Sequence, residues 1–586
     1  VSIGGTTTYA WTNSDTSIGL AGSGTGNIAS FTAANSGTTP VTASIVVTPA
    51  FANGGVSCTG PTKTFTITVN PTAQVNQPDS QVICNGSSSS DIIFSTANTG
   101  GTTSYNWVNN TSGIGLADSG AGDITAFQAV NNGTAPVVVT ITVTPSYNNG
   151  SVSCSGPSKS VILTINPTAE VEQSGNQTLC NGSSTLAITF ATVSTGGTTT
   201  YAWTNNTPAI GLSASGTGNI ASFATVNNGA APVTATVTVT PTFSNAGVSC
   251  SGPAKSFTIT VNPTAQVNDI TSQVICNGSN TTDVIFGSVS NGGTTSFDWT
   301  NDLPGIGLPA SGTGNIASFT AINTGTSPVT ATIVVTPTFA NGGVSCTGPT
   351  KTFTFKVNPT AEVNAISNQV RCNGSNTAAV TFATANTGAT TSYAWTNDTP
   401  GIGLAASGTG NIAVFTAINA GTSPIKATII VQPTLTSNGV SCDGPTESFT
   451  ITVNPTAQLE ATDNQVLCNG SNTTAVTFST TTNGGTTTYA WTNTTTSIGL
   501  AASGTGDIAS FTALNTSTAP VVATVVVTPT FANGGVSCTG PSETFTISVN
   551  PTAEVDQPAS QVLCNGAATT AVTFATQSTG GATTYA

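Results

Sequence analysis

The sequence contains no histidine and no methionine, and only 5% of its 586 residues are charged. Because Ser-His-Asp and Cys-His arrangements both need a histidine, we predict no catalytic residues and a chain that is not an enzyme. Only 7 lysine and arginine residues stand against 21 aspartate and glutamate residues, which gives a net charge of −14. Such a chain lacks a basic surface for phosphate groups, so a nucleic-acid partner is not expected.

Long apolar runs are missing as well. The apolar runs have the length of strands and are interrupted by threonine, so none is long enough for a transmembrane helix. Neither a metal site nor a cofactor site is predicted, because the sequence has no CxxC motif and its acidic residues do not recur together at fixed positions. The glycine-rich stretch GSGTGN at 22–27 lacks the lysine and the helix of a phosphate-binding loop, and we interpret it as a turn.

What the sequence does have is a strict repeat of 96 residues. Its tryptophans and its Asn-Pro pairs all recur at this distance, without insertions. A period of this length is close to the size of an independently folding domain. The tryptophans are Trp11, Trp107, Trp203, Trp299, Trp395 and Trp491. The prolines of the junctions are Pro71, Pro167, Pro263, Pro359, Pro455 and Pro551.

Boundaries at the Asn-Pro pairs give seven repeats, which we number along the chain. Repeats 1 and 7 are partial and cover 1–70 and 551–586. Repeats 2 to 6 are complete and cover 71–166, 167–262, 263–358, 359–454 and 455–550. Because the first ten residues match the last ten after a shift of six periods, we expect the sequence to be part of a longer array.

Within a repeat, apolar and polar residues alternate with period two, and no helical stripe is present. In TFTITV, Phe65, Ile67 and Val69 should face the core while the threonines face water. In repeat 2 we expect strands near AQV, DIIFST, TSYNWV, ITAFQAV, VVVTITVT and SVILTI, separated by Gly, Asn, Ser and Pro clusters. The predicted fold class is all-β, with tandem immunoglobulin-like β-sandwich domains in an extended filament.

Each tryptophan follows another aromatic residue by two positions, so both side chains should point to the same face of a strand. The first residue of the pair is tyrosine in five copies and Phe297 in the sixth, which loses the hydroxyl and keeps the ring. This exchange favours packing, and we expect the six tryptophans to be core aromatics. The alternative is an exposed aromatic pair that stacks on a sugar.

Twelve cysteines form two series, with one member of each series in every period. Two cysteines per repeat, in a chain without histidine, indicate structural disulfides formed in an oxidising compartment. The first series is Cys58, Cys154, Cys250, Cys346, Cys442 and Cys538. The second series is Cys84, Cys180, Cys276, Cys372, Cys468 and Cys564.

The sequence leaves two pairings of these cysteines open. Cys84 and Cys154 lie in one repeat, and a bond between them would stabilise that domain by roughly 4 kcal/mol on the chain-entropy model. In an immunoglobulin-type topology, however, these two residues lie at opposite ends of the sandwich. Cys84 would then meet Cys250 of the next repeat and brace the two neighbours. A bond between Cys58 and Cys84 is rejected, because these residues should lie far apart.

The tetrapeptide CNGS contains a sequon for N-glycosylation. A tight Asn-Gly turn is the stronger interpretation, because Asn565 keeps the turn without the serine. The sequons are at Asn85, Asn181, Asn277, Asn373 and Asn469.

The order of motifs in each repeat resembles that of a known family. CNG is followed by TTYAWTN, GTGNIASFTA, PVTATIVVTPTFANGGVSCTGP and TFTITVNPTA. This order is similar to the PKD-like, immunoglobulin-like repeats of very large surface adhesins in Bacteroidota, and the similarity covers the whole chain. One departure is that the WDFGDG segment of typical PKD domains is absent, so features tied to that motif are not carried over.

The resemblance implies export by the type IX system, attachment at the outer surface of a bacterial cell and, for gliding-motility adhesins, movement by a motor complex. Its implied partners are neighbouring repeats of the same chain, surface polysaccharide or substratum, and outer-membrane motility or secretion machinery.

Three functions are compatible with this sequence. The first is a structural stalk that displays a distal adhesive region and transmits force, with domains coupled at the Asn-Pro pairs because proline fixes φ. The second is a multivalent glycan-binding array, which requires an exposed cleft at one position of every repeat. The third is a spacer in a secreted enzyme. We favour the first.

Overall fold

The computed structural model describes residues 4–586, which fall into two compact units. The first unit extends to Val267 and includes Ser288–Ser296 and Pro337–Pro349, whereas the second comprises the remaining residues. The division therefore passes through repeat 4 and not through an Asn-Pro pair. It does so because the segment Pro337–Pro349, the tip of a hairpin in repeat 4, groups with the repeats that precede it.

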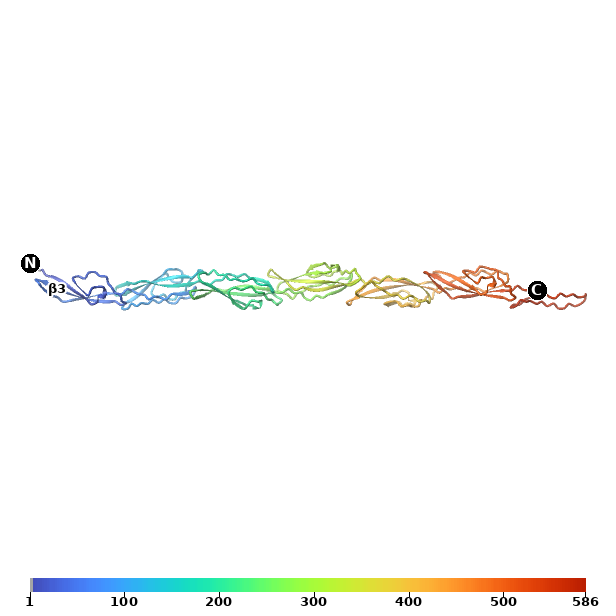
Figure 1. Cartoon of the computed structure of the whole chain (residues 1–586), viewed down its shortest axis with the longest axis horizontal. Helices are drawn as coiled ribbons and strands as arrows, with labels where there is room; N and C mark the ends of the chain where they lie inside the picture. Colours follow the sequence, from blue (N-terminus) through green and yellow to red (C-terminus); the bar gives the residue numbers. More distant parts are fainter. Residues whose placement is uncertain (1–3) are drawn as a thin grey trace. The chain divides into compact units, whose positions relative to one another are not determined.

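In the first unit, each repeat is built round one sheet of mostly antiparallel strands, and helix is almost absent from the ribbon (Figure 1). In repeat 3 the strand order is β12-β17-β15-β13-β14, and β16 also pairs with β15. The first strand is parallel to its neighbour, whereas the other pairings are antiparallel. The central strands of repeats 1 to 6 are β3 (Val41–Asn53), β9 (Val137–Asn149), β15 (Val233–Asn245), β21 (Val329–Asn341), β27 (Ile425–Ser437) and β33 (Val521–Asn533).

The remaining elements recur at fixed positions. The parallel strands that end in a cysteine are β6 (Gln81–Cys84), β12 (Gln177–Cys180), β18 (Gln273–Cys276), β24 (Gln369–Cys372) and β30 (Gln465–Cys468). The tryptophan strands are β1 (Thr6–Asn13), β7 (Thr102–Asn109), β13 (Thr198–Asn205), β19 (Thr294–Asn301), β25 (Thr390–Asn397) and β31 (Thr486–Asn493). The short edge strands are β2 (Ser23–Thr25), β8 (Ser119–Ala121), β14 (Ser215–Thr217), β20 (Ser311–Thr313), β26 (Ser407–Thr409) and β32 (Ser503–Thr505).

The strands that return from the hairpin are β4 (Val56–Thr59), β10 (Val152–Ser155), β16 (Val248–Ser251), β22 (Val344–Thr347), β28 (Val440–Asp443) and β34 (Val536–Thr539). The last strands of the repeats are β5 (Lys63–Val69), β11 (Lys159–Asn166), β17 (Lys255–Asn262), β23 (Lys351–Asn358), β29 (Glu447–Asn454) and β35 (Glu543–Asn550). Single turns of 3-10 helix are η1 (Thr16–Ile18), η2 (Pro208–Ile210), η3 (Pro304–Ile306), η4 (Pro400–Ile402) and η5 (Thr496–Ile498).

The core of repeat 3 lies between this sheet and a second layer of extended chain. The sheet contributes Trp203, Val237 and Ile259, and the second layer contributes Ile188 and Phe190. The ring of Trp203 lies against the backbone of Gly216 on the edge strand, where a Cβ atom would come within 2.2 Å of the ring. All six tryptophans are buried.

The second layer is less regular than the sequence pattern predicts. The prediction of strands at AQV, DIIFST and ITAFQAV was wrong, because only isolated bridges such as Ile92 to Ile124 join the last two segments. Side chains replace part of the missing ladder. The carboxylate of Asp123, for example, accepts a hydrogen bond from the backbone amide of Phe94 at 2.8 Å. A backbone amide that binds a side chain is not available to a neighbouring strand.

The other three predicted strands of repeat 2 are present. TSYNWV lies in β7, VVVTITVT in β9 and SVILTI in β11. The short strands β6, β8 and β10 were not predicted from the sequence. All three have only 3 or 4 residues, which is too short for an alternating pattern to be recognised.

The second unit contains the same architecture. In repeat 6 the strand order is β30-β35-β33-β31-β32, and Trp491, Val525 and Ile547 of the sheet pack against Val476 and Phe478. The predicted all-β fold with repeated domains of about 96 residues is confirmed, with 44% of residues in strands and 3% in helix.

Candidate functional site at the junctions between repeats

The end of each sheet brings a cysteine and an asparagine side by side. Because β12 runs parallel to β17, Cys180 lies opposite Asn262, the asparagine of an Asn-Pro pair. The parallel pairing of β12 with β17 therefore places Cys180 and Asn262 where a neighbouring repeat can bind both. The equivalent pairs are Cys84 with Asn166, Cys276 with Asn358, Cys372 with Asn454, and Cys468 with Asn550.

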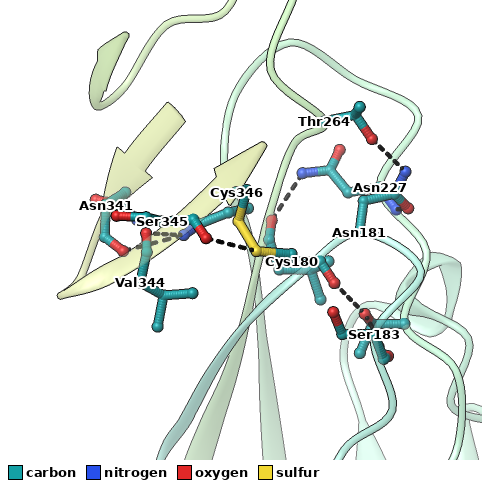
Figure 2. Close-up of a disulfide and its surroundings, with 12 residues drawn as sticks. Cys180, Asn181, Ser183, Asn227, Thr264, Asn341, Val344, Ser345 and Cys346 are labelled. Carbon is teal, nitrogen blue, oxygen red and sulfur yellow. Dashed lines mark hydrogen bonds between the residues drawn. A yellow bond between two sulfur atoms is a disulfide. The ribbon is translucent and has the colours of Figure 1, made fainter. Parts of the chain in front are cut away.

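A hairpin of the following repeat reaches both members of this pair. Cys346 on β22 forms a disulfide with Cys180, and the two Cα atoms are 5.4 Å apart (Figure 2). On the same hairpin, the side-chain amide of Asn341 donates to Oδ1 of Asn262 at 2.9 Å. Asn262 in return donates to the backbone carbonyls of Asn341 at 3.0 Å and Val344 at 3.4 Å. Asn262 is fully buried, so these hydrogen bonds do not compete with water.

The structure contains four disulfides of this kind, and all of them join neighbouring repeats. Their partners are separated by 166 residues in the sequence. Of the two pairings that the sequence left open, the structure therefore has the one between repeats and not the one within a repeat. The bonds are Cys84–Cys250, Cys180–Cys346, Cys276–Cys442 and Cys372–Cys538.

Four cysteines that the sequence analysis assigned to disulfides are unpaired, namely Cys58, Cys154, Cys468 and Cys564. At a separation of 166 residues, the partner position of each of them falls outside the given sequence.

The residue that follows each junction cysteine is also part of the junction. The backbone amide of Asn181 donates to the carbonyl of Asn262 at 2.9 Å, and its side-chain amide donates to Oγ1 of Thr264 at 2.9 Å (Figure 2). Its Oδ1 accepts a hydrogen bond from the backbone amide of Asn227 at 2.8 Å. Gly182 follows with a φ of 80°, as a tight Asn-Gly turn requires. The sequon nitrogen is thus engaged inside the fold, which favours the turn interpretation over glycosylation.

A second contact joins neighbouring repeats away from the disulfide. The backbone amide of Thr195 in repeat 3 donates to the carbonyl of Thr134 in repeat 2 at 2.8 Å. Beside it Gly196 has a φ of 77°, and a Cβ atom there would come within 2.8 Å of Pro136. Two separate attachments restrict rotation about the intervening Asn-Pro pair. Equivalent hydrogen bonds run from Thr99 to Thr38, Asn291 to Ala230, Thr387 to Thr326, Asn483 to Thr422, and Thr579 to Thr518.

One junction in the second unit departs from this pattern. Opposite Asn358 the hairpin carries Ser437 in place of an asparagine, and neither side-chain polar atom of Asn358 has a hydrogen-bond partner within the described chain. A different contact is formed instead, because Nζ of Lys356 donates to Oδ1 of Asn438 at 2.7 Å. The disulfide Cys276–Cys442 is kept.

From the sequence, the asparagine of each Asn-Pro pair was expected only to precede the proline, and its pairing with a second asparagine side chain was not predicted. A signal was present in the sequence. Asparagine recurs one residue before the hairpin turn in five of six copies, at Asn53, Asn149, Asn245, Asn341 and Asn533. A residue that only begins a turn does not need to be asparagine, so its regular recurrence after the central strand indicates a further role.

Burial and hydrogen bonds shift the pKa values of several titratable groups among the described residues. Burial raises the pKa of Tyr201 above its usual value. The backbone amide of Thr428 and the hydroxyl of Thr399 donate to Asp398 and lower the pKa of its carboxyl group. Between residues 4 and 586, no three His, Cys, Asp or Glu side chains gather in a way that could hold a metal ion. Nor does this part of the chain contain a helix long and apolar enough to cross a membrane.

A surface hollow of 590 Å³ in repeat 3 contains the aromatic residue that precedes the tryptophan. It is lined by Tyr201 with Thr199, Thr217 and Asn219. The ring of Tyr201 packs against Phe190, with the ring centroids 5.4 Å apart, and so contributes to the core as well.

Comparisons with known proteins give only general likenesses. No family model and no curated protein matches the sequence. Among solved structures, a fragment of mouse cadherin-23 (EC22-24) matches with a TM-score of 0.28 and 16% identity over 49% of this chain and 98% of its own. Titin domains I67–I69 match with a TM-score of 0.25 and 10% identity over 49% of this chain and 97% of theirs. At these values the likeness carries no information on function.

Proposed function

We propose that this chain is the structural stalk of an extracellular filament on a bacterial surface, which displays a distal adhesive region and transmits force. The observation that carries the proposal is the junction, in which Cys180 is bonded to Cys346 and Asn262 is buried against Asn341. An array that only binds ligands could join its domains by flexible linkers. A stalk needs neighbours that cannot separate or turn freely, and these junctions meet that need.

The disulfides support the extracellular part of the proposal, because such bonds persist in oxidising environments. The resemblance of the repeats to PKD-like domains of Bacteroidota adhesins supports the bacterial part. It adds export by the type IX system and, in the gliding-motility case, movement along the cell by a motor complex.

A test uses antibodies against the full chain on intact, non-permeabilised cells of the source organism. The proposal expects strong labelling of the cell exterior, which disappears after the surface is shaved with protease. Labelling only after permeabilisation would overturn it.

The second candidate is a multivalent glycan-binding array, favoured by the hollow beside Tyr201 with its hydroxyl and amide groups. The two functions are separated by presenting the purified full chain to a panel of immobilised polysaccharides. If the chain is a stalk, it should bind none of the polysaccharides. Binding that is lost when Tyr201 and the tyrosines at the same position of other repeats are changed to alanine would replace the stalk proposal with the glycan-binding one.

A further inference from the structure

The four disulfides are linked to one another by short segments of chain. Cys250 and Cys276 are the two ends of one such segment, which we call a junction segment and which contains β17, the Asn-Pro pair and β18. Cys250 is bonded backwards to Cys84, and Cys276 is bonded forwards to Cys442. Both ends of the segment are therefore fixed to other repeats.

These links make a continuous covalent path through every second junction segment. It runs from Cys84 across a disulfide to Cys250, along the chain to Cys276, and across a disulfide to Cys442. A second path runs from Cys180 to Cys346, along the chain to Cys372, and across to Cys538. The two paths share no residue and alternate along the sequence.

We propose that these two covalent paths limit the elongation of the array, so that forced unfolding releases far less length than it would in the same chain without its disulfides. This inference rests on the proposed function as a stalk under load. Each path makes the array resist stretching through covalent bonds, independently of how strongly any domain resists unfolding.

The extended length of a path can be compared with the length of the repeats that it crosses. A junction segment such as Cys250–Cys276, fully extended at about 3.6 Å per residue, spans at most about 94 Å. The Cα atoms across a disulfide are 5.5 Å apart. Together they bridge two repeats, and the 13-residue central strand of one repeat is itself about 43 Å long. The path across two repeats is therefore only slightly longer than their two central strands together.

The bodies of the domains lie off both paths. The stretch between Cys180 and Cys250 contains β13, β14 and β15 with the core residue Trp203. If this core is pulled apart, the stretch becomes a slack loop between two fixed cysteines. Forced unfolding of a body that the shortest route does not cross then changes the loop and not the distance between the ends of the array.

The experiment is single-molecule stretching of the full chain, held by peptide tags at its two ends, with the unpaired cysteines alkylated. In the oxidised chain the shortest covalent route between the ends crosses once from one path to the other, through the stretch Cys180–Cys250 or Cys372–Cys442. This route contains roughly 230 residues, so its length should reach a limit of about 830 Å. After reduction of all disulfides the limit should rise to about 2,100 Å. An oxidised chain that reaches the reduced limit contradicts the inference.

A variant distinguishes the proposed paths from disulfides that each close a loop inside one repeat, which would give a similar limit for the oxidised chain. The variant changes Cys84, Cys250, Cys276 and Cys442 to serine and so removes one path while the other stays intact. The remaining path should hold, and the limit should rise by only about 90 Å. If each cysteine closed a loop within its own repeat, the same variant would lose four loops and gain about 1,000 Å.

A matched control shows whether the variant still folds. Its near-ultraviolet circular dichroism, which reports the buried tryptophans, should equal that of the unaltered chain. If the variant loses this signal, the variant that changes Cys180, Cys346, Cys372 and Cys538 removes the other path and carries the same prediction. Surface labelling of cells does not depend on the elongation limit. An array that stretches freely would therefore overturn this inference and leave the stalk proposal standing.

Discussion

The junction at Asn262 and the junction at Asn358 carry the same disulfide but differ in their buried amides. At Asn262 two side-chain amides bind each other, whereas at Asn358 the hairpin offers Ser437 and the buried amide has no partner within the described residues. The Cα atoms of the two disulfides are nevertheless 5.4 and 5.5 Å apart. The covalent bond therefore does not depend on the amide pair, and the missing pair leaves a buried polar group whose desolvation costs about 1–3 kcal/mol.

The largest expected effect comes from removing the disulfide at each of the two junctions. Cys346→Ser and Cys442→Ser each lose roughly 5 kcal/mol of stabilisation on the chain-entropy model. The amide pair remains in the first variant only, so the hairpin around β28 should open more in Cys442→Ser than the hairpin around β22 does in Cys346→Ser. Hydrogen exchange with mass spectrometry measures both openings. Equal exchange in the two hairpins would show that the amide pair contributes nothing.

The next effect is the loss of one amide. Asn262→Ala removes hydrogen bonds to the hairpin and leaves the amide of Asn341 without a partner, at an expected cost of about 1–3 kcal/mol in the free energy of local opening. The matched control is Asn358→Ala, which removes a side chain without hydrogen bonds and should be nearly neutral. Hydrogen exchange of β22 and β28 gives the two values, and a larger cost at Asn358 would contradict the comparison.

Restoring the missing partner should have the opposite sign. In Ser437→Asn the new amide faces Asn358 and can form the pair seen at Asn262. A gain of about 1 kcal/mol in the local opening free energy is expected, the ordinary value of a net hydrogen bond. The double variant that combines Ser437→Asn with Asn358→Ala is the control and should lose the gain. Its persistence would mean that the asparagine stabilises the hairpin in another way.

The exposed contact that is specific to the Asn358 junction should matter less. Lys356→Thr removes the hydrogen bond to Asn438 and introduces the residue found at the same position of repeats 3 and 5. An exposed contact of this kind contributes roughly 0.5 kcal/mol or less. Slightly faster or unchanged exchange of β28 agrees with this limit, whereas a loss of local stability comparable to that of Asn262→Ala would show that the lysine is a main contact of this junction.

The smallest effect lies outside the junctions, where repeat 5 has Asp398 and repeat 3 has Asn206 at the same position. Both accept a backbone hydrogen bond, from Thr428 and Thr236 respectively, at 2.8 Å. Because folding lowers the pKa of Asp398, its contribution is present above the unfolded value of 3.8 and is lost as the pH falls through the lower folded value. Asp398→Asn should leave Tm unchanged at pH 7 and reduce the loss of Tm at pH 3. A variant as acid-sensitive as the parent would contradict this assignment.

The sequence predicted the sheet more successfully than the layer that covers it. In β15 and β17 the alternation of threonine with valine, isoleucine and phenylalanine follows directly from burial on one face. In the second layer, residues such as Asp123 hydrogen-bond to backbone amides, and an alternating pattern then no longer implies a strand.

The pairing of the cysteines could not be derived from spacing alone. It depends on two features of the tertiary structure, namely the parallel pairing of β12 with β17 and the approach of the β21–β22 hairpin to the preceding repeat. A strand of 4 residues such as β12 gives almost no sequence signal. The position of Cys180 beside Asn262 therefore became clear only from the structure.

The central claim is that each junction cysteine binds the following repeat and not its own. Peptide mapping of the oxidised full chain under non-reducing conditions tests this most directly, and Cys276 is the best position because Asp443 gives the Cys442 peptide a distinctive mass. The account predicts a linked pair that contains Cys276 and Cys442. A linked pair that contains Cys276 and Cys346, which lie in the same repeat, would contradict it.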